Sequence, residues 1–160
     1  MATLPLPDSS ELPCCWQSQE SLEVDYRDEL YQLTSVMAVE KRGLTLIVFD
    51  PLGRKLLSVT QHGSEIEKQL FTDSAELPVQ WLLPAVYLAH MNQQRWSTDQ
   101  SPWSVGEQDS RLVLYFRQRP TVMVQGFTDG DLPQAGHQRV VRFIEHGLTL
   151  TITTLVSEAL

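Results

Sequence analysis

The sequence predicts a mainly β protein with one helical segment, in which a curved antiparallel sheet forms an incomplete barrel. Two observations support this fold class. Nine short β-type runs are separated by turn residues, and one stretch without strand alternation, residues 77–96, divides them into two groups. Short connections favour antiparallel neighbours, and 160 residues are enough for one domain with a real core.

The nine runs are predicted strands with unusually apolar faces. They are LEVDYR (22–27), ELYQLTSVMAVE (29–40), LTLIVF (44–49), RKLLSVT (54–60), EIEKQLF (65–71), RLVLYF (111–116), TVMVQGF (121–127), QRVVRFIE (138–145) and LTLTITTLV (148–156). In LTLIVF, for example, Ile47 and Phe49 lie on the face opposite Leu46. We therefore expect both faces to be covered, and the inner one to hold either a filled core or an apolar cavity for a ligand.

The dividing segment, residues 77–96, is predicted to be an interrupted helix. Pro78 and Pro84 each suit a first helical position, so we expect a short turn from Pro78 and a helix from Pro84 to about Gln93. Nearly every side chain in its centre is apolar, which leaves the helix no solvent face. It is too short to span a bilayer, so we expect it to close the concave side of the sheet as a lid.

Composition and charge argue against several partners. The net charge is −8 and the pI is about 4.9, so we expect no nucleic acid partner and no strong attraction to an anionic membrane. The two cysteines, Cys14 and Cys15, are adjacent and offer no metal-ligand pattern. The start, MATLPLPDSS, lacks the features of a signal peptide. Residues 1–20 are predicted to be a flexible tether, and residues 21–160 a single domain.

The sequence contains no motif for catalysis or for a cofactor. The four histidines lack the spacing that would place two of them on one metal, so no metal site is expected. In HGSEIE, residues 62–67, Ser64 lies close to His62 and an acid, but the G-x-S-x-G turn of a hydrolase is absent. A hydrophilic hairpin tip is the alternative interpretation. We therefore expect a protein that is not an enzyme, with a Ser64 hydrolase as the weakest hypothesis.

One predicted turn carries an apolar residue where turn chemistry favours a polar one. In IVFDPLGRKLL, Asp50, Pro51 and Gly53 are standard turn residues, whereas Leu52 at the third position is not. Burying a leucine elsewhere would contribute about 1.5–3 kcal/mol. Turn chemistry therefore does not explain Leu52.

These features together resemble a known family. The order LTLIVFDPLGRKLLSVTQHG, then LPVQWLLPAVYLAHM, then a further set of β runs resembles the LolB-like lipoproteins of the Gram-negative outer membrane. The chain is more closely similar to an uncharacterised lipoprotein family related to LolA and LolB, some members of which accompany aryl-polyene biosynthesis genes. The resemblance covers most of residues 22–156. It implies a half-barrel closed by a helical lid, with an apolar cavity that accepts acyl chains.

The resemblance also implies roles for particular residues. In LolB-like proteins the loop after the third strand carries an apolar residue that helps deliver cargo to the membrane. Leu52, presented by Asp50, Pro51 and Gly53, matches this residue by motif and by order. The candidates for the cavity and its lid are mostly apolar; they are Leu46, Val48, Trp81, Leu82, Leu83, Val86, Tyr87, Leu88, Met91, Leu114 and Met123.

Two main hypotheses follow from the resemblance. The first is non-enzymatic binding of an acyl chain, lipid or lipoprotein, with transfer or insertion at the outer membrane. The expected location is the periplasmic face of that membrane, reached through a lipidated cysteine that is absent from this chain. The second is a structural or assembly factor with a filled barrel, which binds a protein partner in an outer-membrane or aryl-polyene pathway.

Overall fold

The computed structural model describes residues 8–12, 14–71, 81–90, 102–109, 111–126 and 133–160. Within them, ten strands form one antiparallel sheet in the order β5-β4-β3-β2-β1-β10-β9-β8-β7-β6. The strands are β1 (Trp16–Tyr26), β2 (Glu29–Glu40), β3 (Gly43–Phe49), β4 (Lys55–His62), β5 (Glu65–Leu70), β6 (Trp103–Gln108), β7 (Arg111–Phe116), β8 (Arg119–Gln125), β9 (Gln138–Phe143) and β10 (Leu148–Ala159). The α-helix is α1 (Leu82–His90), and η1 (Ser9–Glu11) and η4 (Ile144–His146) are 3-10 turns.

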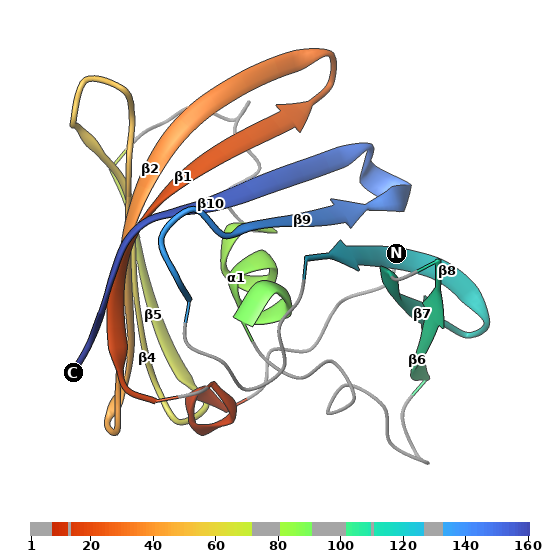
Figure 1. Cartoon of the computed structure of the whole chain (residues 1–160), viewed down its shortest axis with the longest axis horizontal. Coiled ribbons are helices and arrows are strands. Elements are labelled where there is room, and N and C mark those ends of the chain that lie inside the picture. Colours follow the sequence, from red (N-terminus) through yellow and green to blue (C-terminus); the bar gives the residue numbers. More distant parts are fainter. Residues whose placement is uncertain (1–7, 13, 72–80, 91–101, 110, 127–132) are drawn as a thin grey trace.

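The first and last strands pair with each other in the middle of the sheet. β1 and β10 run antiparallel from the pair Trp16 and Ala159 to the pair Tyr26 and Leu148. The two edges are β5 and β6, which α1 separates in sequence. The sheet is therefore open, and it curves around α1, which lies on its concave side (Figure 1).

The strands alternate between a buried inner face and a more exposed outer face. In β1, the residues from Trp16 to Val24 at every second position are buried, and those between them are exposed or half-buried. β10 follows the same pattern from Leu148 to Thr154. The main hydrophobic core therefore lies between the inner face of the sheet and α1.

The strand predictions agree with the structure apart from three main differences. Each of the nine predicted runs overlaps one strand, but β6 was missed, β1 begins at Trp16 rather than Leu22, and the run 138–145 ends in η4, which contains Ile144 and Glu145. The boundary of the predicted tether, at residue 20, is therefore wrong: residues 16–20 belong to the sheet, and Leu12 before them is buried. The stretch WQSQE shows no apolar alternation, because both of its faces are largely polar.

The helix begins two residues earlier than predicted. Pro84 is the third residue of α1, not the first, which is allowed because the first N–H groups of a helix have no partner within it. All nine residues of α1 are buried, so the prediction of a helix without a solvent face is confirmed. The predicted start of the turn at Pro78 and the predicted helix end at Gln93 lie outside the described residues.

The prediction that both faces of the apolar strands are covered is wrong for β3. Leu46 is fully buried on the inner face, whereas Ile47 and Phe49 on the outer face are only half-buried. The curved sheet packs its concave face on α1 and leaves its convex face to solvent. In the part of the chain that the structure describes, no helix has the length and apolarity needed to cross a membrane.

Candidate functional site

The turn between β3 and β4 holds Leu52 out in solvent. Oδ1 of Asp50 accepts hydrogen bonds from the backbone N–H groups of Leu52 and Arg54, both at 2.9 Å, and Oδ2 lies 2.7 Å from Nε of Arg54. The backbone donor of Arg54 is the main reason that the pKa of Asp50 lies below its usual value. Gly53 closes the turn with a φ of 81°. Leu52 is 79% exposed, the most exposed large apolar side chain among the described residues.

Most of the predicted cavity and lid residues share one hydrophobic cluster. They are Leu46 and Val48 on β3, Leu114 on β7, and Leu82, Leu83, Val86, Tyr87 and Leu88 on α1. Trp81, just before α1, is half-buried, and its ring centroid lies 4.9 Å from that of Phe143 and 4.4 Å from that of His146. The structure thus brings these side chains together on the concave side of the sheet.

Met123 is the exception among these residues. Its neighbours Val122 and Val124 are buried on the inner face of β8, so strand alternation turns Met123 to the other face. There its sulfur lies 3.5 Å from Nη1 of Arg111. The prediction that Met123 lines the cavity is therefore wrong, and Met91 lies outside the described residues.

Two polar contacts join α1 to the sheet. The hydroxyl of Tyr87 donates to Oε1 of Gln61 on β4, and Nε2 of Gln61 donates to the carbonyl of Gly63 at 2.9 Å. At the last residue of α1, Nε2 of His90 lies 3.3 Å from Oε1 of Glu20 on β1. Burial raises the pKa of Tyr87, so its hydroxyl remains a donor at neutral pH. The other side chains of α1 are apolar.

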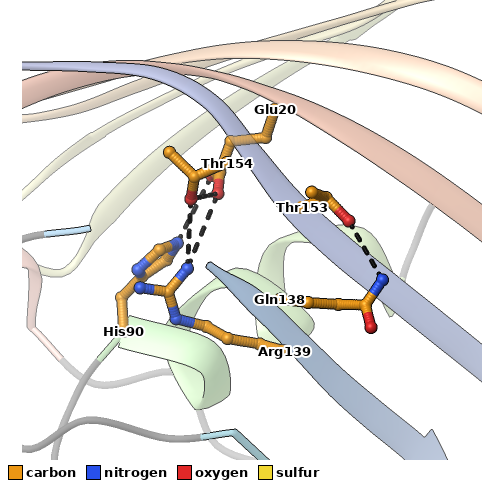
Figure 2. Close-up of polar contacts among 6 residues, drawn as sticks. All are labelled: Glu20, His90, Gln138, Arg139, Thr153 and Thr154. Carbon is orange, nitrogen blue, oxygen red and sulfur yellow. Dashed lines mark hydrogen bonds and ion pairs between the residues drawn. The ribbon is translucent and has the colours of Figure 1, made fainter. Parts of the chain in front are cut away.

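The contact at His90 belongs to a buried polar cluster of Glu20, His90, Arg139 and Thr154 (Figure 2). The hydroxyl of Thr154 donates to Oε2 of Glu20 at 3.0 Å and accepts from Nη1 of Arg139 at 3.2 Å. The same Nη1 lies 3.9 Å from Oε2 of Glu20. The side chains of Glu20 and Arg139 are each only 1% exposed. Three strands and the end of α1 therefore meet at one enclosed ion pair.

The electrostatics of this cluster favour a charged Glu20. Burial raises the pKa of Glu20, but the hydrogen bond and charge of His90, the hydroxyl of Thr154 and the charge of Arg139 together hold it below its usual value. Burial lowers the pKa of Arg139, and the charge of Glu20 opposes that shift. Nε of Arg139 is buried without a hydrogen-bond partner among the described residues, so within them the pair is incompletely satisfied.

The sequence did not reveal this cluster. Glu20 fell within the predicted tether. Arg139 lies in a run that carries a second cation, Arg142, on its outer face, so the run does not single out Arg139 as buried. The outer face of the same strands is ordinary: Nε2 of Gln138 donates to Oγ1 of Thr153 at 3.3 Å near the surface (Figure 2). Strand alternation assigns Arg139 to the inner face with Val141, which is the one signal that could have found it.

The proposed Ser64 hydrolase gains no geometric support. Ser64 is exposed in the turn between β4 and β5, and Nδ1 of His62 donates to the carbonyl of Arg42 at 3.1 Å. Among the described residues, no group of three or more His, Cys, Asp or Glu side chains is arranged to hold a metal. The candidate site is therefore the apolar concave face with α1, together with the Leu52 turn.

Two small hollows lie elsewhere on the sheet. One, of about 190 Å³, lies over β2, β1 and β10 and is lined by Val36, Val156 and their polar neighbours. The other, of about 230 Å³, lies at the β1–β2 turn beside Arg27 and Tyr31. No residue of α1 lines either hollow.

Comparison with known families gives one match. Residues 17–156 match the model of a family described as protein of unknown function, DUF3261. No curated protein matches the chain. The matched range begins one residue after the start of β1 and ends within β10, so it spans the whole sheet.

Proposed function

The chain belongs to the DUF3261 family, and we propose that it is a non-enzymatic carrier that binds an acyl chain of a lipid or lipoprotein in the concave side of its sheet. In this proposal the protein acts at the periplasmic face of the Gram-negative outer membrane, held there by a lipid anchor outside this chain. The LolB-like resemblance supports the location and the type of cargo.

The observation that carries the proposal is α1 within the open sheet. A helix whose nine residues are all buried occupies an apolar concave face, and its described polar contacts to the sheet come from Tyr87 and His90. An acyl chain needs apolar side chains on all sides and no hydrogen-bond partners, and the apolar side chains of α1 have apolar neighbours of this kind in the core cluster. We infer that cargo takes the place of α1 against the inner face of the sheet.

The energies of such an exchange are balanced. Burying a sixteen-carbon chain contributes roughly 12 kcal/mol at about 0.8 kcal/mol for each methylene. A membrane buries the acyl chain with about the same gain in free energy. When α1 packs again on the inner face of the empty protein, the apolar surface that the cargo covered is buried again. A carrier of this kind therefore needs a movable apolar element rather than a chemical step.

In the proposal, Leu52 guides the empty or loaded protein to the membrane. An inserted leucine contributes about 1.5–3 kcal/mol, which biases contact without anchoring the protein. The hydrogen bonds of Asp50 keep this side chain extended in the absence of a membrane, so little order must be gained on insertion.

Binding of a fluorescent acyl probe tests the proposal. Delipidated protein titrated with cis-parinaric acid is expected to give saturable binding that palmitate displaces, and native mass spectrometry of untreated protein is expected to show bound lipid. A protein with neither bound lipid nor saturable probe binding would contradict the proposal.

That negative outcome would instead support the second candidate function, a structural or assembly factor. The specific observation in its favour is that every residue of α1 is already buried, as in the core of a permanently packed protein. In that case the exposed Leu52 turn would bind a protein partner, and the interior would only support the fold.

A further inference from the structure

A second set of exposed apolar side chains lies next to the Leu52 turn. The backbone N–H of Phe71, at the end of β5, donates to the carbonyl of Leu56 on β4 at 3.0 Å. Nζ of Lys55 lies 5.9 Å from the centroid of the Phe71 ring. The β3–β4 turn and the end of β5 therefore form one surface, here called the β3–β5 corner, made of Leu52, Arg54, Lys55, Lys68, Leu70 and Phe71.

The corner exposes more apolar side chains than is usual for an edge strand. Leu70 is 55% exposed and Phe71 is 46% exposed, beside Leu52 at 79%. Leu70 pairs with Leu57, which is buried on the inner face, so Leu70 lies on the concave side yet remains open to solvent. Strand alternation turns Phe71, the next residue, to the convex side, so exposed apolar side chains lie on both sides of this edge. Edge strands are normally protected by polar side chains, so two exposed apolar residues at the end of one indicate a contact surface.

The charge of the corner is opposite to that of the chain. Residues 50–58 and 67–71 contain Arg54, Lys55 and Lys68 as cations and Asp50 and Glu67 as anions, a net charge of +1 in a chain of −8. Asp50 is paired with Arg54, and both lysines are exposed. Charges beyond about 8 Å are screened at physiological ionic strength, so a surface touching the corner meets its local positive charge.

We propose that the β3–β5 corner docks the protein on an anionic phospholipid bilayer, with Leu52, Leu70 and Phe71 in the interface and Lys55 and Lys68 on the lipid phosphates. The proposal rests on the membrane contact of the proposed function and names its full surface and its lipid class. Lysines suit this arrangement because their stems lie along apolar surface while the ammonium reaches the headgroups. With Leu70 on the concave side, docking also brings the inner face of the sheet to the bilayer.

Vesicle flotation of the full chain tests the corner. We expect binding to vesicles of phosphatidylcholine with phosphatidylglycerol, and binding at least about tenfold weaker to phosphatidylcholine alone or at high salt. Leu70→Ser with Phe71→Ser, and separately Lys55→Gln with Lys68→Gln, are each expected to weaken binding about tenfold. Leu155→Ser with Val156→Ser is the matched control, because these exposed apolar residues lie on β10, away from the corner.

Two single variants, Phe71→Ser and Lys55→Gln, separate this proposal from the proposed function, because each should still weaken vesicle binding. Binding of cis-parinaric acid in solution is expected to be unchanged in both, because strand alternation turns Phe71 away from the concave side and Lys55 lies next to its ring. The docking proposal would be contradicted if the corner variants bound vesicles as strongly as the native chain. It would also be contradicted if the native chain bound equally strongly to both vesicle types. A native chain that shows no saturable probe binding would instead contradict the carrier function, and the docking proposal would be unaffected.

Discussion

Glu20 and Arg139 place a buried ion pair at one end of an otherwise apolar interior. Removing two charges from water costs several kcal/mol for each, and their attraction repays this only with good geometry and further hydrogen bonds. Here Thr154 and His90 supply those bonds to Glu20, while Nε of Arg139 has no hydrogen-bond partner in the part of the chain that the structure describes. The pair is therefore sensitive to the loss of either member.

Substituting Glu20→Gln is expected to reduce the free energy of unfolding at pH 7 by about 3 kcal/mol, because it leaves Arg139 buried without an anion. Chemical denaturation measures this change. Glu23→Gln on the outer face of the same strand is the control and is expected to have little effect. A Glu20→Gln protein as stable as the native chain would contradict the role of the cluster.

The pH dependence of stability follows from the same carboxylate. The pKa of Glu20 is lower in the folded chain than in the unfolded chain, so the unfolded state binds more protons as the pH falls below about 4.5. The contribution of Glu20 is complete above that pH and is lost as the pH falls through the folded pKa. Denaturation between pH 6 and pH 3 should therefore show a shallower acid loss in Glu20→Gln than in the native chain. Parallel curves would contradict the shift.

Leu52→Glu is expected to separate membrane contact from folding. The side chain is almost fully exposed, so the stability should change by less than about 0.5 kcal/mol. Transfer of a bound acyl probe to vesicles should slow markedly, because a charged side chain cannot enter the bilayer. Leu155→Glu on β10 is the control. Unchanged transfer by Leu52→Glu would remove the role assigned to the turn.

Residues could be predicted from the sequence where the signal was local. Leu52 was recognisable because turn chemistry has a fixed expectation at each position, and the structure confirms its exposure. The partnership of Glu20 and Arg139 was not recognisable, because it depends on which distant strands pair in the sheet. Thr154 links them only once β1, β10 and β9 are placed side by side.

At the scale of elements, the β3–β4 pairing depends on close backbone approach at Gly43. A Cβ at this position would collide with the backbone carbonyl of Gln61 on β4. Gly53 has open space around it, although its φ is 81°. We therefore expect Gly43→Ala to cost more than about 2 kcal/mol of stability and Gly53→Ala only about 1 kcal/mol, measured by thermal unfolding. Equal costs would contradict the packing at this strand pair.

The helix gives a second prediction at this scale. Tyr87→Phe removes the hydrogen bond from α1 to Gln61. This loss shifts the equilibrium toward the displaced helix by about 1 kcal/mol. If cargo takes the place of α1, the variant should bind cis-parinaric acid about fivefold more tightly, because more of the protein is competent to bind. Tyr31→Phe, whose hydroxyl donates to Glu29 at the surface, is the control. Unchanged or weaker binding by Tyr87→Phe would argue against displacement.

The elements were predictable to the extent that each showed its own pattern. α1 was recognisable from its continuous apolar run, but its start was misplaced because Pro84 is also tolerated at the third helical position. β6 was missed because WSVGEQ combines a glycine with an acid and shows no strong alternation. Its pairing with β7 supplies the stability that its own sequence does not indicate.

At the scale of the whole molecule, one pairing decides the architecture. The chain begins and ends in the centre of the sheet, where β1 pairs with β10, and the interruption at α1 therefore falls between the two free edges. α1 lies on the concave side of this sheet (Figure 1). The sequence predicted a curved meander, but pairing between its two ends has no local signature.

Hydrogen exchange of α1 tests the central claim, that cargo replaces the helix on the inner face of the sheet. The account predicts that amides of residues 85–90 exchange faster in protein saturated with palmitate than in delipidated protein, while β1 and β10 stay protected. Palmitate that binds saturably and leaves α1 equally or better protected would contradict the account.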